Sequence, residues 1–158
     1  MSFFIVTGPT NAGKTTYSNA LAKKGLKAFN FDIYFRQTKG DKSLASRFHK
    51  TCLAIITEAL HDHKNGFDVV CEGAQFLVPP ILAQTLEIVS TTAVIPHFIF
   101  LVPSAQQTMQ NLFARNKGKK RKTRIYLEQF AFSLASYLYF RLCKRTLFDI
   151  VNNSNALV

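Results

Sequence analysis

Residues 8–15 have the types and the spacing of a loop that binds phosphate groups. They read Gly-Pro-Thr-Asn-Ala-Gly-Lys-Thr, which is the pattern G-x-x-x-x-G-K-T. Glycine at Gly8 and Gly13 lets backbone N–H groups turn toward phosphate oxygens, where a Cβ would obstruct them. Lys14 is placed to reach the β- and γ-phosphates, and the Thr15 hydroxyl is a ligand for Mg²⁺. The pattern therefore predicts a P-loop that binds ATP together with Mg²⁺.

The sequence around this loop has the order that a P-loop requires. An apolar run at 3–6 precedes it and reads as a buried strand, and a helical pattern follows at 14–23. That helix would direct the positive end of its dipole at the same phosphates. The residues expected to contact the nucleotide lie in the loop and in the first turn of the helix: Gly8, Asn11, Ala12, Gly13, Lys14, Thr15 and Thr16.

Two of the nine acidic residues, Asp32 and Glu72, directly follow apolar runs at 26–31 and 67–71 that read as strands. Ligands of an open parallel sheet bind beyond the carboxyl ends of its strands. We expect Asp32 to accept the proton of an acceptor hydroxyl, since phosphoryl transfer needs a positioned base or orienting group. Glu72 is expected either to hold Mg²⁺ through water or to bind the acceptor. For both carboxylates the alternative is a helix-capping or loop role.

Seven basic residues lie between positions 115 and 124, with no acidic residue among them. They are Arg115, Lys117, Lys119, Lys120, Arg121, Lys122 and Arg124. They supply most of the net charge of +11, so the basicity is local. We expect a lid that closes Arg115, Arg121 and Arg124 over the phosphates and stabilises the transferred charge. A solvated loop and a contact for nucleic acid are the alternatives.

Strand patterns and helix patterns alternate along the chain. Strands are predicted at 3–6, 26–31, 67–71, 97–102 and 147–151, and helices at 14–23, 44–65, 79–90, 104–115 and 125–145. Short continuous apolar strands between helices indicate a parallel sheet that is covered on both faces. We predict a single domain, 1–158, with a three-layer α/β P-loop NTPase fold and a five-stranded parallel sheet in the order 2-3-1-4-5.

The composition, 47% hydrophobic and 18% charged, is that of a globular protein. No apolar run has the length of a transmembrane helix, so we expect no membrane partner. The three cysteines have no C-x-x-C spacing, which favours a reduced, cytoplasmic compartment, and the four histidines have no zinc-ligand spacing.

Three segments resemble the P-loop nucleoside and nucleotide kinases. Residues 10–16, Thr-Asn-Ala-Gly-Lys-Thr-Thr, are similar to the phosphate loop of nicotinamide riboside kinases. Residues 31–36 resemble the Asp-x-Phe-Tyr segment of uridine kinases, and 68–73 resemble their Asp-Val-Val-x-x-Glu-Gly strand. The resemblance implies that the aspartate, Asp32, is the base, and that Arg115 lies at the entry of the lid. The substrate contacts it implies are Asp32, Tyr34, Arg36 and Glu72.

Together these features predict an ATP-dependent kinase that transfers the γ-phosphoryl group to a small, nucleoside-like hydroxyl acceptor. One alternative is a nucleoside monophosphate kinase, with Arg36 and Arg47 as the nearby arginines for a phosphate acceptor. Another is a kinase for polynucleotide ends or DNA bases, held through 115–124. A nucleotide-binding regulatory module is the non-enzymatic alternative, although the Asn-Lys-x-Asp motif usual in GTP switches is missing from the sequence.

Overall fold

The structure of the chain, a computed structural model, describes residues 1–9, 11–38 and 43–102 and the backbone of 148–152. It also describes the single positions 106, 110, 114, 131, 135 and 138. Apart from these positions, the predicted helices 104–115 and 125–145 lie outside the described residues. The basic segment 115–124, with Arg115, Arg121 and Arg124, lies outside them entirely.

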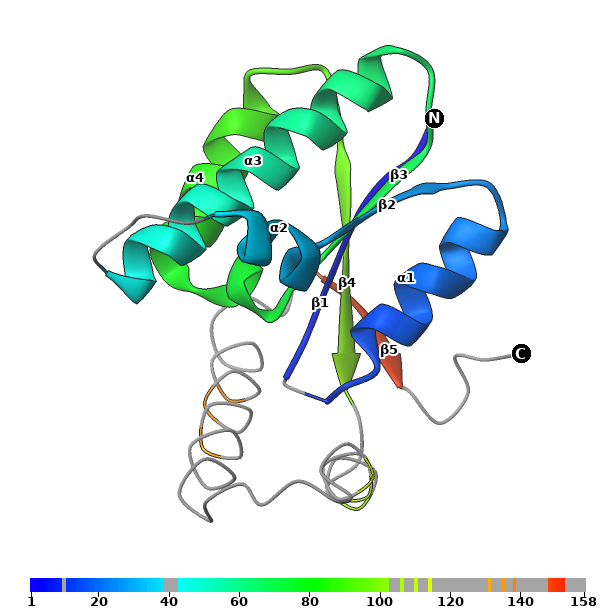
Figure 1. Cartoon of the computed structure of the whole chain (residues 1–158). Helices are drawn as coiled ribbons and strands as arrows, with labels where there is room; N and C mark the ends of the chain where they lie inside the picture. The colour runs from blue at the N-terminus through cyan, green and yellow to red at the C-terminus, as the bar shows by residue number, and fades with distance from the viewer. Residues whose placement is uncertain are drawn as a thin grey trace.

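A parallel sheet forms the centre of the described structure (Figure 1). Its strands are β1 (Phe3–Thr7), β2 (Lys27–Asn30), β3 (Val69–Glu72), β4 (Pro96–Val102) and β5 (Phe148–Asn152). They run in the order β2-β3-β1-β4-β5, and β5 pairs in parallel with the outer side of β4. The predicted parallel α/β sheet is confirmed, with its first four strands in the order 2-3-1-4.

Helices cover both faces of this sheet. Along the chain they are α1 (Lys14–Lys23), α2 (Phe31–Gln37), α3 (Leu44–Lys64), the 3₁₀ turn η1 (Ala74–Leu77) and α4 (Pro79–Ser90). Figure 1 shows α1 on one side of the sheet and α3 with α4 on the other. Alternate residues of β1 face the two sides, so that Phe3 and Ile5 join the core under α3 and α4, whereas Val6 joins the core under α1. No helix in the described part of the chain is long and apolar enough to cross a membrane.

Several predicted strand ends differ from the structure by one or two residues, and two of these differences have a clear physical cause. The second strand was predicted to extend to Phe31 and to end at Asp32, but β2 ends at Asn30 and α2 begins at once. The reason is the Asn30 side chain, whose Oδ1 accepts a hydrogen bond from the Ile33 N–H at 3.2 Å and so caps the helix. The third strand begins at Val69 rather than at Phe67, whose exposed ring lies 3.5 Å beneath the Lys27 ammonium.

Helix α3 agrees with the predicted helix at 44–65 and ends one residue earlier, at Lys64. Ser43 caps it by accepting a hydrogen bond from the Ser46 N–H at 3.1 Å. Leu44 is apolar but 60% exposed, because the helix meets the core only from its second turn onward. The buried residues of the helix are Thr51, Cys52, Ile55, Ile56, Ala59 and Leu60.

Side chains of α3 hold the short helix α2 at its middle and at its C-terminal end. Arg47 donates from Nε to the Thr38 carbonyl and from an Nη to the Phe35 carbonyl, both at 3.0 Å, and its guanidinium lies over the Phe35 ring. The Tyr34 hydroxyl donates to a Glu58 carboxylate oxygen at 2.6 Å. Burial first, and then the hydrogen bond and charge of Glu58, raise the pKa of Tyr34 well above its ordinary value.

These contacts predict a pH dependence for the variant Tyr34→Phe. A raised pKa means that folded Tyr34 keeps its proton where the unfolded side chain loses it, so wild-type stability falls as the pH rises above about 10. Near neutral pH the variant should be less stable by about 1 kcal/mol, because the bond to Glu58 is lost. Urea unfolding should show this difference shrinking above about pH 10. A difference that stays constant up to about pH 11 would contradict the assignment.

Candidate functional site

The loop between β1 and α1 contains three residues with positive φ angles. Gly8, Asn11 and Gly13 have φ angles of 144°, 66° and 84°, which glycine adopts readily and asparagine tolerates better than most residues. A Cβ at Gly8 would lie 2.7 Å from the Leu101 carbonyl oxygen of β4, so only glycine fits there. Gly13 is the N-cap of α1 and has no side chain to occupy the first N–H groups of the helix.

The Lys14 ammonium lies against this loop. Its Nζ donates to the Pro9 carbonyl at 2.8 Å and to the Gly8 carbonyl at 3.2 Å. Both acceptors are neutral, and a phosphate oxygen carries the negative charge that an ammonium binds more strongly. A nucleotide in the loop would therefore compete for Lys14 with these two carbonyls.

A buried carboxylate, Glu72, lies beside the loop at the end of β3. It is 4% exposed. The Thr15 hydroxyl of α1 donates to it at 3.2 and 3.3 Å from its two oxygens, and Asn30 Nδ2 at the end of β2 donates to Oε1 at 2.6 Å. Strand register brings these residues together, because Glu72 pairs with Asn30 on one side and with Val6 on the other. The predicted pair Thr15 and Glu72 is thus in contact.

Asn30 was missed by the sequence analysis. Because Asn30 stands between Phe29 and Phe31, the sequence pattern predicted that it lies in the interior of an apolar strand. The available signal was its type, because asparagine is rare in strands and common at helix N-caps. A helix beginning at Phe31 would have placed Asn30 at the carboxyl edge of the sheet.

Three of the four residues predicted to contact the acceptor lie on α2, and the fourth is Glu72 of β3. Asp32 is exposed in its first turn, two residues beyond Asn30, and Arg36 is exposed in its last turn. Tyr34 is half-buried, and its hydroxyl is bonded to Glu58 of α3. Arg47, the second arginine considered for a phosphate acceptor, closes the C-terminal end of α2 instead.

The chemistry around Glu72 fits Mg²⁺ better than a transition metal. Among the described residues, no three His, Cys, Asp or Glu side chains gather as a metal-binding group. Mg²⁺ keeps several waters and takes one or two protein ligands together with substrate phosphates. The adjacent Thr15 hydroxyl and Glu72 carboxylate are hard oxygen donors of that kind.

Neither described cysteine is placed as a nucleophile. Cys52 and Cys71 are free thiols buried in the core between the sheet and α3. Burial raises the pKa of Cys52 to about 12 and also raises that of Cys71, which keeps both thiols protonated near neutral pH. Their role in this part of the chain is packing.

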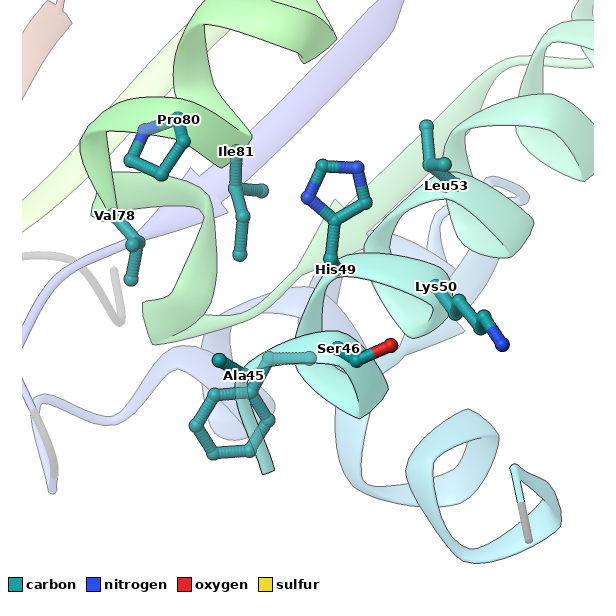
Figure 2. Close-up of a pocket in the computed structure, with 9 residues that line it drawn as sticks. Ala45, Ser46, His49, Lys50, Leu53, Val78, Pro80 and Ile81 are labelled. Atoms are coloured by element: carbon teal, nitrogen blue, oxygen red, sulfur yellow. The ribbon is translucent and has the colours of Figure 1, made fainter. Parts of the chain in front are cut away.

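A separate cavity of about 530 Å³ lies between the N-terminal half of α3 and the start of α4 (Figure 2). Its walls are mainly apolar, with Ser46, His49 and Lys50 as the polar members. The remaining lining residues are Ala45, Phe48, Leu53, Val78, Pro80 and Ile81. None of the residues predicted to bind nucleotide, metal or acceptor lines it.

Comparison with known proteins gives similarity in structure only. No family model matches the chain, and no curated protein matches its sequence. Shikimate kinase from Acinetobacter baumannii, solved with shikimate, has a TM-score of 0.64 at 14% identity, over 95% of this chain and 82% of that one. Shikimate kinase from Bacteroides thetaiotaomicron has a TM-score of 0.55 at 21% identity, over 99% and 89%.

An APS kinase is also similar. The APS kinase of Mycobacterium tuberculosis, solved with AMPPNP and APS, has a TM-score of 0.58 at 13% identity, over 77% of this chain and 76% of that one. At these identities the comparisons show the fold alone, which the described structure shares with these kinases.

The loop geometry predicts that Gly8→Ala is more damaging than Gly25→Ala. Both positions have positive φ, so alanine is strained at each by about 1 kcal/mol, but a Cβ at Gly25 meets nothing within 4 Å. At Gly8 the new methyl group must also displace the Leu101 carbonyl. Chemical unfolding should show the larger loss for Gly8→Ala, and calorimetry should show that only this variant loses affinity for ATP. Equal losses in stability would mean that the close approach to β4 is absent.

Proposed function

We propose that this protein is an ATP-dependent phosphotransferase that moves the γ-phosphoryl group onto a hydroxyl of a small, nucleoside-like acceptor. The observation that carries the proposal is the contact of Thr15 with the buried Glu72 beside the loop that holds Lys14. The predicted phosphate-binding loop, an ammonium and a carboxylate–hydroxyl pair then lie at one edge of a parallel sheet, where such folds bind their ligands. The kinase fold of the structural neighbours supports the same activity.

In this proposal each side chain has one task. The loop and Lys14 bind the β- and γ-phosphates, and Thr15 with Glu72 would hold Mg²⁺, which neutralises charge on the phosphate oxygens. The acceptor oxygen forms a bond to the γ-phosphorus while the bond to the bridging oxygen breaks, so that ADP leaves with that electron pair. The acceptor proton passes to the Asp32 carboxylate.

The two arginines in the described part of the chain, Arg36 and Arg47, favour a hydroxyl acceptor over a nucleoside monophosphate. A phosphate acceptor needs guanidinium groups that face it. Arg47 is engaged with the carbonyls of α2 and with the Phe35 ring, which leaves Arg36 as the exposed arginine of that helix. The neighbours named as kinases of shikimate and of APS suggest extending the set of test acceptors to small hydroxy acids.

A transfer assay with γ-labelled ATP tests the proposal. The wild-type protein is given nucleosides, nucleoside monophosphates, small hydroxy acids and oligonucleotides in turn, with Mg²⁺. Label is expected on a small hydroxyl compound. Transfer only to an oligonucleotide would favour the nucleic-acid kinase that the basic segment 115–124 allows, and binding of ATP without any transfer would favour the regulatory module.

Lys14→Ala is expected to abolish transfer without unfolding the protein. Lys14 is half-buried at the loop, where its ammonium donates to two loop carbonyls, and its side chain does not belong to the buried core of the described residues, so the fold should persist without it. The control is Lys23→Ala, which removes an exposed lysine from the last turn of the same helix and should behave as wild type. Turnover at the wild-type rate in the Lys14 variant would refute the phosphate-loop assignment.

Asp32→Asn should separate catalysis from nucleotide binding. If Asp32 is the base, kcat falls by roughly 10²-fold or more while the affinity for ATP changes little. Glu87→Gln, an exposed carboxylate change on α4, serves as the control and should leave both quantities unchanged. A collapse in ATP affinity with a normal rate per bound complex would instead assign Asp32 to the metal and leave Glu72 as the base.

A further inference from the structure

The Asn30 side chain joins two parts of the site that the sequence had treated separately. Its Oδ1 accepts a hydrogen bond from the Ile33 N–H at the start of α2, at 3.2 Å. Its Nδ2 donates to the Glu72 carboxylate at the end of β3, at 2.6 Å. One amide group therefore connects the helix that carries Asp32 with the carboxylate that contacts Thr15.

The chemistry of the two partners fixes the orientation of this amide. A backbone N–H can only donate, and a carboxylate oxygen can only accept. Reversing the amide would place its N–H₂ against the Ile33 N–H and its oxygen against Glu72, so both contacts would become repulsive. The strand register, which pairs Asn30 with Glu72, keeps the two residues opposite each other.

Glu72 depends on this donor because it is almost completely buried. A buried carboxylate requires hydrogen bonds that replace those of water. The Thr15 hydroxyl and Asn30 Nδ2 both supply such bonds, and the one from Asn30 is the shorter. A Thr15 hydroxyl that bound a metal through an oxygen lone pair would keep its proton and could still donate to Glu72, and the amide of Asn30 would hold the carboxylate from β2.

We propose that Asn30 is a positioning residue, which orients the Glu72 carboxylate for Mg²⁺ and ties that orientation to the N-terminus of α2. The part of this inference that concerns Mg²⁺ rests on the proposed function. A displacement of α2, which carries Asp32, would be transmitted through Asn30 to Glu72. The acceptor side and the metal side of the site are then coupled through one amide.

A stability cycle tests the pairing without any nucleotide. Asn30→Asp keeps an oxygen that caps α2 but replaces the donor by a second carboxylate against Glu72. Its melting temperature should fall by several degrees. Combining it with Glu72→Gln should recover most of that loss, because the repulsion is removed. Asn19→Asp, an exposed change on α1, is the control and should not depend on Glu72. Additive effects of the two substitutions would overturn the inference.

The proposed effect of Asn30 on Mg²⁺ binding is tested by measuring the affinity of the protein for AMPPNP, first with Mg²⁺ and then with EDTA. Asn30→Ser retains a capping oxygen but loses the donor to Glu72, so it should melt a few degrees below wild type and still be folded at the temperature of the binding assay. We expect about tenfold weaker binding than wild type with Mg²⁺ and no change with EDTA. Equal losses under both conditions, or none, would overturn the positioning role. Failure of the wild-type protein to bind AMPPNP would contradict the proposed function, and the stability cycle would still decide the Asn30–Glu72 pairing.

Discussion

A carboxylate that is removed from water must be hydrogen-bonded or paired, and Glu72 meets this requirement with donors from two other elements. Thr15 comes from the first turn of α1 and Asn30 from the end of β2. Satisfying Glu72 therefore fixes the loop, β2 and β3 relative to one another at the carboxyl edge of the sheet. Parallel sheets bind their ligands at this same edge. The hydrogen bonds around Glu72 therefore contribute both to the stability of the fold and to the geometry of the site.

The rest of the described structure supports that edge from two sides. On one face, α3 and α4 cover Phe3 and Ile5 of the central strand, and on the other α1 covers Val6. The proposed nucleotide side is thus built on buried strands. The proposed acceptor side is the short helix α2, which Tyr34 and the contacts of Arg47 hold to α3 while Asp32 is exposed. This division suits a kinase that binds one constant nucleotide and a more variable acceptor.

Much of this arrangement could be predicted from local patterns. The G-x-x-x-x-G-K-T spacing, the apolar strands and the Ser43 cap are short-range signals that the sequence carries directly. The start of α2 could not be predicted from a local pattern, because the apolar residues Phe29 and Phe31 on either side of Asn30 resemble a strand that continues. Arg47 also gave no local signal, since its partners are carbonyls nine and twelve residues away in the sequence. Only the tertiary structure shows that the Arg47 guanidinium is hydrogen-bonded to carbonyls at the end of α2.

The most direct test of the account is a crystal structure of the protein with AMPPNP and Mg²⁺. The account predicts that the Lys14 ammonium leaves the Pro9 and Gly8 carbonyls for phosphate oxygens. It also predicts that Mg²⁺ lies about 2.1 Å from the Thr15 hydroxyl oxygen, with the Glu72 carboxylate bound to the metal directly or through one water. A nucleotide bound away from the loop, or a Mg²⁺ with Glu72 outside its coordination and hydration shells, would contradict the central claim.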